Sequence, residues 1–372
     1  MSVPLPKHLP SIDGLRALAI ILVLISHIPY TAGYTLPEYN RYLIPLGSLG
    51  VRVFFVISGF LITYLLLREH KERGSIGIRS FYIRRAFRLL PVYYVYLLVV
   101  FILQMTIGIR ETTGSWFGSI TYMRNMFGSG DSLTVHFWSL SVEEQFYVFM
   151  PFIAVLCLMS KHYLKLLGAV FASFLVIGLV ARTVPCASES FVCERLMAPR
   201  SILKYIDSLG VGCLLAVLFF SGVVKVQKRL WGIEFILMAA IIGTPYVLWP
   251  YEITAPIQLI QAVLIASLIV YCLSSTSALY GVMNSSPAIW IGRLSYSLYV
   301  WHMLFIVHFY GDVAPDIWLM DWKFWLIPSV ACACASYFFL EKPLRKVGHR
   351  LSKRLTSQID EAAQQAPEPV RS

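Results

Sequence analysis

Long apolar stretches separated by short polar ones run through almost the whole chain. A helix needs roughly 20 mostly apolar residues to cross the hydrocarbon core of a bilayer. The stretches with this character are 12–29, 49–67, 90–109, 139–159, 165–182, 205–221, 231–249, 256–273, 291–310 and 322–340. The pattern predicts an all-α fold, a polytopic transmembrane helix bundle with about ten spanning helices. No small-residue cleavage site follows the first stretch, so we expect a retained span and not a signal peptide.

The composition argues against an ordinary water-soluble domain. Of 372 residues, 58% are apolar and 14% are charged, whereas about 25% are charged in soluble domains. The polar surface is too small to cover a particle in water, so lipid must supply much of the contact. We expect one membrane domain over 1–354. Residues 355–372 are rich in Gln, Ala, Pro and Glu without apolar periodicity, which favours a disordered cytoplasmic tail.

The net charge of +11 agrees with the tendency of Lys and Arg to collect in cytoplasmic loops. If the N-terminus is inside, most of the 31 Lys and Arg residues fall in inner segments, which predicts that both termini are cytoplasmic. Nucleic acid is therefore not expected as a partner. Cys186 and Cys193 share the expected outer loop 183–204, where an oxidising compartment permits a disulfide. The sequence does not decide whether Cys186 and Cys193 are bridged or free. It contains no cluster of metal-ligating residues.

Ionisable groups within spanning helices are costly and mark functional sites. Arg16 and His27 lie on the first span, eleven residues apart, so they share one helix face at roughly 16 Å along the axis. We expect both to be catalytic. The alternative is that Arg16 reaches the membrane interface through its long stem and that His27 is an ordinary interfacial histidine.

A second candidate group opens the span near 139–159. Ser139, Glu143 and Tyr147 recur every four residues and share a face. Glu143 could orient a histidine and stabilise its cation, as the acid of a catalytic triad does. The alternative is an acid that is favoured there only by the helix dipole.

Two further groups are basic or aromatic. Arg84, Arg85 and Arg88 would converge on one helical turn, where planar guanidinium groups suit phosphate; the positive-inside tendency alone also explains them. Ser295, Tyr299 and His302 share a face at spacings of four and three, although polar aromatic residues are common at membrane interfaces.

These motifs together resemble the acyltransferase-3 family, the integral membrane O-acyltransferases that acetylate bacterial surface glycans. The resemblance runs from Ile12-Asp13-Gly14-Leu15-Arg16-Ala17 to Glu341-Lys342-Pro343. It includes Arg16 with ten residues before His27, the stretch Phe54 to Ile62, Arg85-x-x-Arg88, Trp138 to Tyr147, and Ser295 to His302. Many relatives have an acid where this chain has Arg52, so the role of that acid does not carry over. Some relatives also append a periplasmic esterase-like domain, for which this chain is too short.

The resemblance implies a multi-pass protein of the bacterial inner membrane. It implies an acyl-CoA donor, usually acetyl-CoA, that enters from the cytoplasm, and a glycan hydroxyl as acceptor at the outer side. His27 matches the family's presumed catalytic histidine, and Arg16 and the Arg85/Arg88 pair match its arginines. Glu143 matches the acid of the Ser-x-Glu-x-x-x-Tyr pattern that runs from Ser141 to Tyr147.

The resulting hypothesis assigns a role to each candidate. The donor phosphates bind Arg85 and Arg88, with Arg84 beside them. His27 acts as general base or carries the acyl group itself, Glu143 orients it, and Arg16 stabilises negative charge. The expected substrate contacts are Tyr147, Ser141 and His302. A different donor, succinyl or a longer acyl group, keeps the same fold. The rival hypothesis is a transporter or flippase for a lipid-linked glycan, with His27 and Glu143 as a proton relay.

Overall fold

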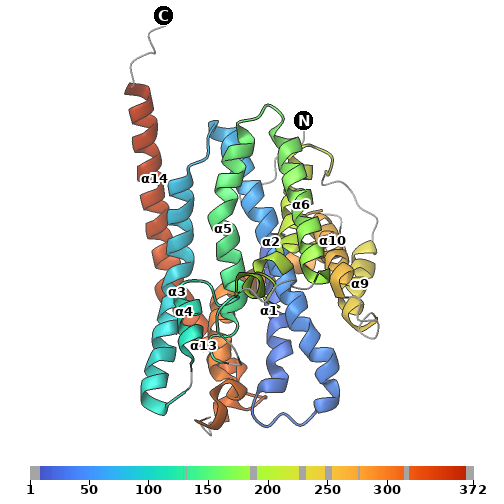
Figure 1. Cartoon of the computed structure of the whole chain (residues 1–372), viewed down its shortest axis with the longest axis vertical. Helices are drawn as coiled ribbons and strands as arrows, with labels where there is room; N and C mark the ends of the chain where they lie inside the picture. The colour runs from blue at the N-terminus through green and yellow to red at the C-terminus, as the bar shows by residue number, and fades with distance from the viewer. Residues whose placement is uncertain are drawn as a thin grey trace, which may run out of the picture.

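The computed structural model describes residues 9–109, 111–128, 130, 132–184, 191–225, 232–247, 254–274, 277–313 and 318–365. The helices are α1 (Pro10–His27), α2 (Asn40–Arg73), α3 (Ile78–Ile107), α4 (Thr113–Ile120), α5 (Phe137–Leu158), α6 (Tyr163–Thr183), α7 (Phe191–Leu196), α8 (Ile206–Phe220), α9 (Ile233–Val247), α10 (Thr254–Cys272), α11 (Ala278–Met283), α12 (Ser286–Trp301), α13 (Leu326–Ser336) and α14 (Lys342–Gln365) (Figure 1). Within this part of the chain, the only β-type pairing is an isolated bridge between Ala32 and Asp321. The all-α expectation is confirmed.

Five helical segments of the described chain are long and apolar enough to cross a membrane. They are Pro10–Tyr30, Pro37–Arg73, Ile78–Ile107, Phe137–Leu158 and Tyr163–Thr183, and shorter apolar helices cover Ile206–Phe220, Ile233–Thr244 and Pro256–Cys272. The structure therefore supports a multi-pass membrane protein with five candidate spans, fewer than the expected ten. The later apolar stretches are less regular: α12 ends at Trp301 and continues as 3-10 turns, and α13 runs through the π-helical turn Tyr337–Glu341 into α14.

The outer surface of the bundle is apolar, as contact with lipid requires. In α3 and α6, roughly a quarter or less of the most apolar window is buried inside the protein. Large side chains such as Phe101, Phe152 and Leu156 are exposed on α3 and α5. An apolar exterior this extensive would associate in water, which agrees with the membrane setting.

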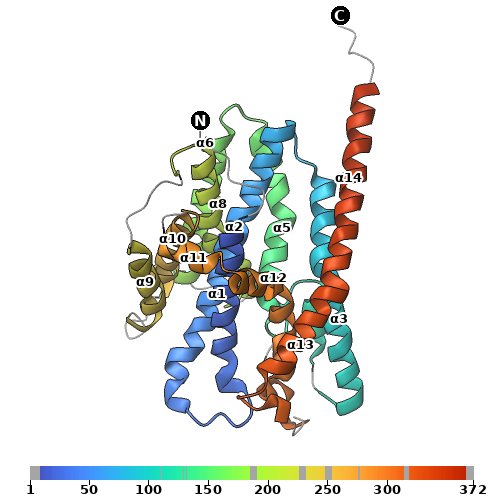
Figure 2. The same cartoon turned by 180° about the vertical axis from the view of Figure 1, so that it is seen from behind.

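Helix α1 lies at the centre of the bundle, between α2 and α12 (Figures 1 and 2). Two glycines permit this close packing. Gly292 of α12 faces the carbonyl oxygen of Asp13, and Gly14 of α1 faces the carbonyl oxygen of Met283. A Cβ atom at either position would collide with the opposite backbone, so only glycine allows α1 to approach its neighbours this closely.

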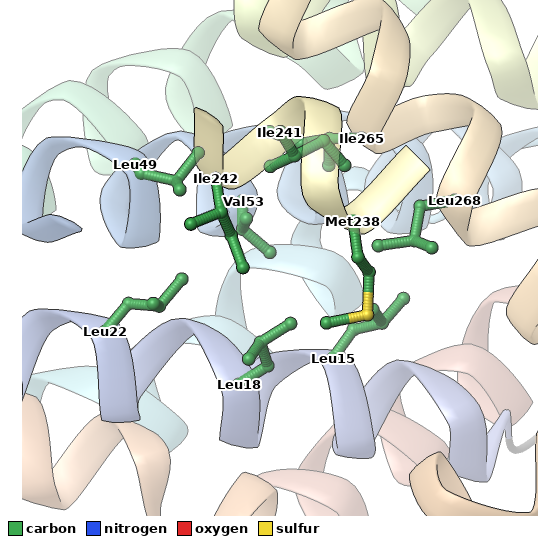
Figure 3. Close-up of a pocket in the computed structure, with 10 residues that line it drawn as sticks. All are labelled: Leu15, Leu18, Leu22, Leu49, Val53, Met238, Ile241, Ile242, Ile265 and Leu268. Atoms are coloured by element: carbon green, nitrogen blue, oxygen red, sulfur yellow. The ribbon is translucent and has the colours of Figure 1, made fainter. Parts of the chain in front are cut away.

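One side of α1 is purely apolar and packs against α9 and α10 (Figure 3). A gap of about 380 Å³ there is lined by Leu15, Leu18, Leu22, Leu49, Val53, Met238, Ile241, Ile242, Ile265 and Leu268. Only hydrocarbon suits such a lining. The ionisable residues of α1 do not line this gap.

Helix α14 packs along α3 and continues past the body of the protein (Figure 2). Arg84 donates to Ser352 Oγ at 2.8 Å, and Ser80 donates to the Ser352 carbonyl at 3.2 Å. Helix α14 extends to Gln365, into the stretch 355–372 for which the sequence predicts a disordered tail. Residues 366–372 lie outside the described residues.

The cysteines divide into two groups. Cys157, Cys213, Cys272, Cys332 and Cys334 are free. Cys193 on α7 is disulfide-bonded. Cys186, which the sequence suggested as its partner, lies outside the described residues.

Candidate functional site

A cavity with both polar and apolar side chains in its lining lies between α1, α2, α5 and α12. Its empty volume is about 360 Å³, and its lining consists of Arg16, Val51, Phe54, Phe55, Ser139, Leu140, Glu143, Ser295, Tyr296 and Tyr299. The structure thus brings together polar residues from three of the stretches that the sequence singled out. Ser139 and Glu143 come from α5, Ser295 and Tyr299 from α12, and Arg16 from α1.

An arginine cluster lies at one end of this cavity. Arg16 and Arg88 interact electrostatically with each other and with acids nearby. The Nε atoms of both are buried and, among the described residues, have no hydrogen-bond partner. A buried donor without a partner is costly, and the natural partner for two guanidinium groups is an anion such as phosphate or carboxylate.

Glu341 supports this cluster from the π-helical turn Tyr337–Glu341 that precedes α14. Its side chain is buried and accepts a hydrogen bond from Ser297 Oγ at 3.0 Å. The charges of Arg88 and Arg16 act on its carboxylate. A buried carboxylate between cations balances part of their charge, so the cluster keeps its shape before a ligand arrives.

Glu143 is held by a second hydrogen-bond chain. Tyr147 Oη donates to Ser58 Oγ at 2.8 Å, and Ser58 Oγ donates to Glu143 Oε1 at 2.6 Å. The guanidinium of Arg85 lies 4.1 Å from the centroid of the Tyr147 ring, a cation–π contact. Arg16, Arg85 and Arg88 all act electrostatically on Glu143. Glu143 and Tyr147 are therefore parts of the arginine cluster.

The expectation that Glu143 orients His27 is not met. Within the described chain, the carboxylate of Glu143 hydrogen-bonds Ser58 and no histidine. His27 has its own partner: Nδ1 lies 2.8 Å from the carbonyl oxygen of Val23, one turn earlier in α1, and 3.2 Å from Ser26 Oγ. A carbonyl oxygen can only accept, so Nδ1 carries the hydrogen, and Nε2 of the neutral ring keeps its lone pair.

Three histidines lie in a row next to the cavity, beside its lining residue Tyr299. The His27 and His302 rings have centroids 5.0 Å apart at 71°, and those of His302 and His136 are 5.3 Å apart at 78°. His302 Nδ1 lies 2.7 Å from the Tyr299 carbonyl oxygen, and His136 Nε2 lies 3.1 Å from that of Val300. His302 is fully buried, and its Nε2 has no partner among the described residues.

A short polar link joins the histidines to the cavity. Tyr299 Oη lies 2.5 Å from Ser139 Oγ and donates to the carbonyl oxygen of His136 at 3.0 Å. Both side chains line the cavity that also contains Arg16 and Glu143. The polar groups therefore form one continuous tract, with guanidinium donors at one end and imidazole bases at the other.

Two sequence candidates have structural roles instead. Arg84 bonds Ser352 of α14 and Glu69 of α2, so it packs helices together outside the arginine cluster. Ser141 donates to the Phe137 carbonyl at 2.9 Å and accepts from the backbone amide of Arg124 at 3.1 Å. Its hydroxyl is thereby occupied, and it does not line the cavity.

Sequence reasoning missed Ser58, Glu341 and His136. Ser58 and Glu341 both stand within stretches that carried the family resemblance, but nothing local distinguishes a Ser that holds a carboxylate from one that packs in a helix. His136 immediately precedes the first residue of α5. The sequence signal available for His136 was its position just before the Trp138–Tyr147 stretch.

Comparisons with known proteins agree on one family. The model of the acyltransferase-3 family, described as an acyltransferase domain, matches residues 9–340. "Putative O-acetyltransferase SACOL0978" of Staphylococcus aureus strain COL is 29% identical over 92% of this chain and 58% of its own length. "Putative peptidoglycan O-acetyltransferase YrhL" of Bacillus subtilis is 28% identical over 94% and 56%. "O-acetyltransferase OatA" of S. aureus strain NCTC 8325 is 26% identical over 93% and 58%.

The chain spans somewhat more than half the length of these curated relatives. No solved structure gives a significant match. The family model covers nearly all of the described helices, including every residue of the cavity. On this match, the chain belongs to the acyltransferase-3 family of membrane acyltransferases.

Proposed function

We propose that this protein is a membrane O-acetyltransferase that moves an acetyl group from cytoplasmic acetyl-CoA to a hydroxyl of a glycan at the outer side of the membrane. The observation that carries the proposal is the polar tract itself. It places arginine Nε atoms that lack a partner among the described residues at one end, and at the other end the imidazole of His27, whose Nδ1 faces the Val23 carbonyl oxygen.

The arginine end is the donor site. A CoA ester is rich in phosphate, and the buried Nε atoms of Arg16 and Arg88, which have no partner among the described residues, can donate to an anion. Arg85 stands beside them over Tyr147. Arg85 and Arg88 lie in the first part of α3, after the α2–α3 turn. That turn lies on the same side of the molecule as the far end of α14 (Figure 1). Both segments are rich in Lys and Arg, which supports a cytoplasmic location for this side and for both termini. About ten membrane crossings follow if the shorter helices also traverse the bilayer.

The histidine end is the acceptor site. The relatives named for peptidoglycan O-acetylation support a glycan acceptor, and such acceptors lie outside the inner membrane. His27 Nε2 is available because Nδ1 is bound to Val23. It reacts with the acetyl group or takes the proton of the attacking hydroxyl. Overall, the C–S bond of the thioester breaks, a C–O bond forms, and the hydroxyl proton balances the leaving thiolate.

The test is mass spectrometry of surface glycans from cells with and without the protein, together with His27→Ala. A mass increase of one acetyl group that is lost in the deletion and in the variant supports the proposal. Unchanged glycan masses with altered surface abundance would instead indicate a transporter, for which the half-buried His27 and Glu143 are also suited.

A further inference from the structure

His302 is a buried, potentially reactive side chain that has no step yet in the proposed acetyl transfer. Its ring is fully buried. Its Nδ1 faces the Tyr299 carbonyl oxygen at 2.7 Å, so Nδ1 holds the hydrogen and Nε2 of the neutral ring is an acceptor. Nε2 has no partner among the described residues. Native proteins rarely leave such an atom unpaired unless a ligand or a reaction uses it.

Acetylation of the neighbouring His27 would create the need for a second base. If His27 carries the acetyl group, Nε2 is bonded to the acyl carbon and Nδ1–H remains on the Val23 carbonyl. Neither nitrogen can then accept the proton of an attacking hydroxyl. The ring next to such an acetyl group, at 5.0 Å between centroids, is His302.

We propose that His302 is the general base of the second half of the transfer, acting through Nε2 on the acceptor hydroxyl while His27 carries the acetyl group. This inference rests on the proposed acetyl transfer and makes it a two-step reaction. It moves His302 from a general substrate contact to a catalytic residue with one defined step.

The two steps balance as follows. In the first, His27 Nε2 attacks the thioester carbon, a C–N bond forms, the C–S bond breaks and CoA leaves as a thiolate. In the second, the acceptor oxygen attacks the acyl carbon, a C–O bond forms and the C–N bond breaks. The hydroxyl proton passes to His302 Nε2, and its later release to water balances the thiolate. His27 returns to its neutral form with Nδ1–H still on Val23.

The local geometry suggests a conservative variant. In His302→Asn, the side-chain amide can still donate to the Tyr299 carbonyl as Nδ1 does, but nothing replaces Nε2. The matched control is His162→Asn, because His162 is exposed in the turn between α5 and α6. Both are tested in the full chain, in cells and in membranes from those cells.

Three quantities are measured: acetyl esters on surface glycans, labelled acetyl retained on the His27 peptide after an acid quench with labelled acetyl-CoA, and acetyl hydroxamate formed on adding hydroxylamine. Hydroxylamine attacks acyl-imidazoles without a general base, so it bypasses His302. For His302→Asn we expect label on His27, hydroxamate formation within about twofold of the unmodified protein, and glycan acetylation lower by roughly a hundredfold or more. His162→Asn should match the unmodified protein in all three.

The inference is overturned if His302→Asn acetylates glycan normally, or if hydroxamate formation falls as far as glycan acetylation, since the residue is then structural. It is also overturned if the unmodified protein acetylates glycans without ever holding label on His27. That result leaves the proposed function intact. Only the absence of glycan acetylation by the unmodified protein in cells contradicts both.

Discussion

The imidazole rings of His27 and His302 lie edge to face with their centroids 5.0 Å apart, although one ends the first helix and the other follows the twelfth. In each ring, Nδ1 forms a hydrogen bond with a backbone carbonyl oxygen of the same segment. The pair therefore presents two Nε2 atoms whose tautomers are set independently of each other and of any carboxylate. This arrangement differs from the His–acid pairing that Glu143 suggested.

We expect two arginines of α3, Arg88 and Arg84, to differ sharply in their effect on acetyl-CoA binding. Arg88→Gln removes a guanidinium whose buried Nε has no partner among the described residues, and it should raise the KM for acetyl-CoA roughly tenfold or more, as loss of a charged hydrogen bond does. Arg84→Gln is the control, because Arg84 is bound to Ser352 and Glu69. Its KM should be nearly unchanged. Equal effects of the two substitutions on KM would contradict the assignment.

Substitution of Glu143 should affect acetyl-CoA binding without changing the contribution of His27 to the pH profile of kcat. In Glu143→Gln the amide still accepts from Ser58, but the negative charge that balances Arg16, Arg85 and Arg88 is lost. We expect a higher KM for acetyl-CoA by roughly tenfold and an unchanged pH profile of kcat. If the kcat profile shifts instead, Glu143 acts on His27 after all. Steady-state kinetics over a pH series decides between these outcomes.

The crossing of α1 and α12 should not tolerate a methyl group. Gly292→Ala places a Cβ against the Asp13 carbonyl and should destabilise the protein by about 1–3 kcal/mol, the usual cost of overpacking. Gly243→Ala is the matched control, because Gly243 of α9 has open space around its Cβ position. The comparison is made by thermal unfolding in detergent. A destabilised Gly243→Ala beside an unaffected Gly292→Ala would refute the packing argument.

His136 should make stability depend on pH. Burial, together with the smaller effects of His27 and Arg124 nearby, lowers the pKa of His136 to about 3. The unfolded chain binds a proton there near pH 6.5, so it holds more protons than the folded chain between these values. Stability should therefore fall as the pH decreases below about 6.5 and stay level above it.

His136→Gln can keep the bond to the Val300 carbonyl and should lose this component of the pH dependence. The check is the unfolding temperature between about pH 7 and pH 5, with His162→Gln as the exposed control. An unchanged slope in His136→Gln would show that another group is responsible.

Apolar patterning and spacing predicted the helical fold and the polar face of α1, because both depend on local periodicity. Arg16 and Glu143 do share one cavity. The partner of Glu143 could not be predicted, since Ser58 reaches it from a different helix. Five of the ten predicted spans have a helix of sufficient length and apolarity among the described residues. Hydropathy measures how apolar a stretch is, and it does not show where Trp301 ends α12.

Arg84 and Ser141 show a further limit of sequence reasoning. Both match the residue types expected at the site, yet each has its hydrogen-bonding capacity used by a neighbouring helix or backbone group. Whether a polar side chain is free for a ligand depends on its tertiary partners. Those partners, and not the residue type, separate Arg88 from Arg84.

The hydrogen bond from His27 to Val23 means that α1 positions its own reactive group. Pro29 lies just beyond the end of α1 and helps to keep the helix from continuing. Under the proposed function, the helices around His27 can therefore change shape and polarity to admit different acceptors while the imidazole stays in place. The acceptor could then vary between relatives without a change in the position of the histidine.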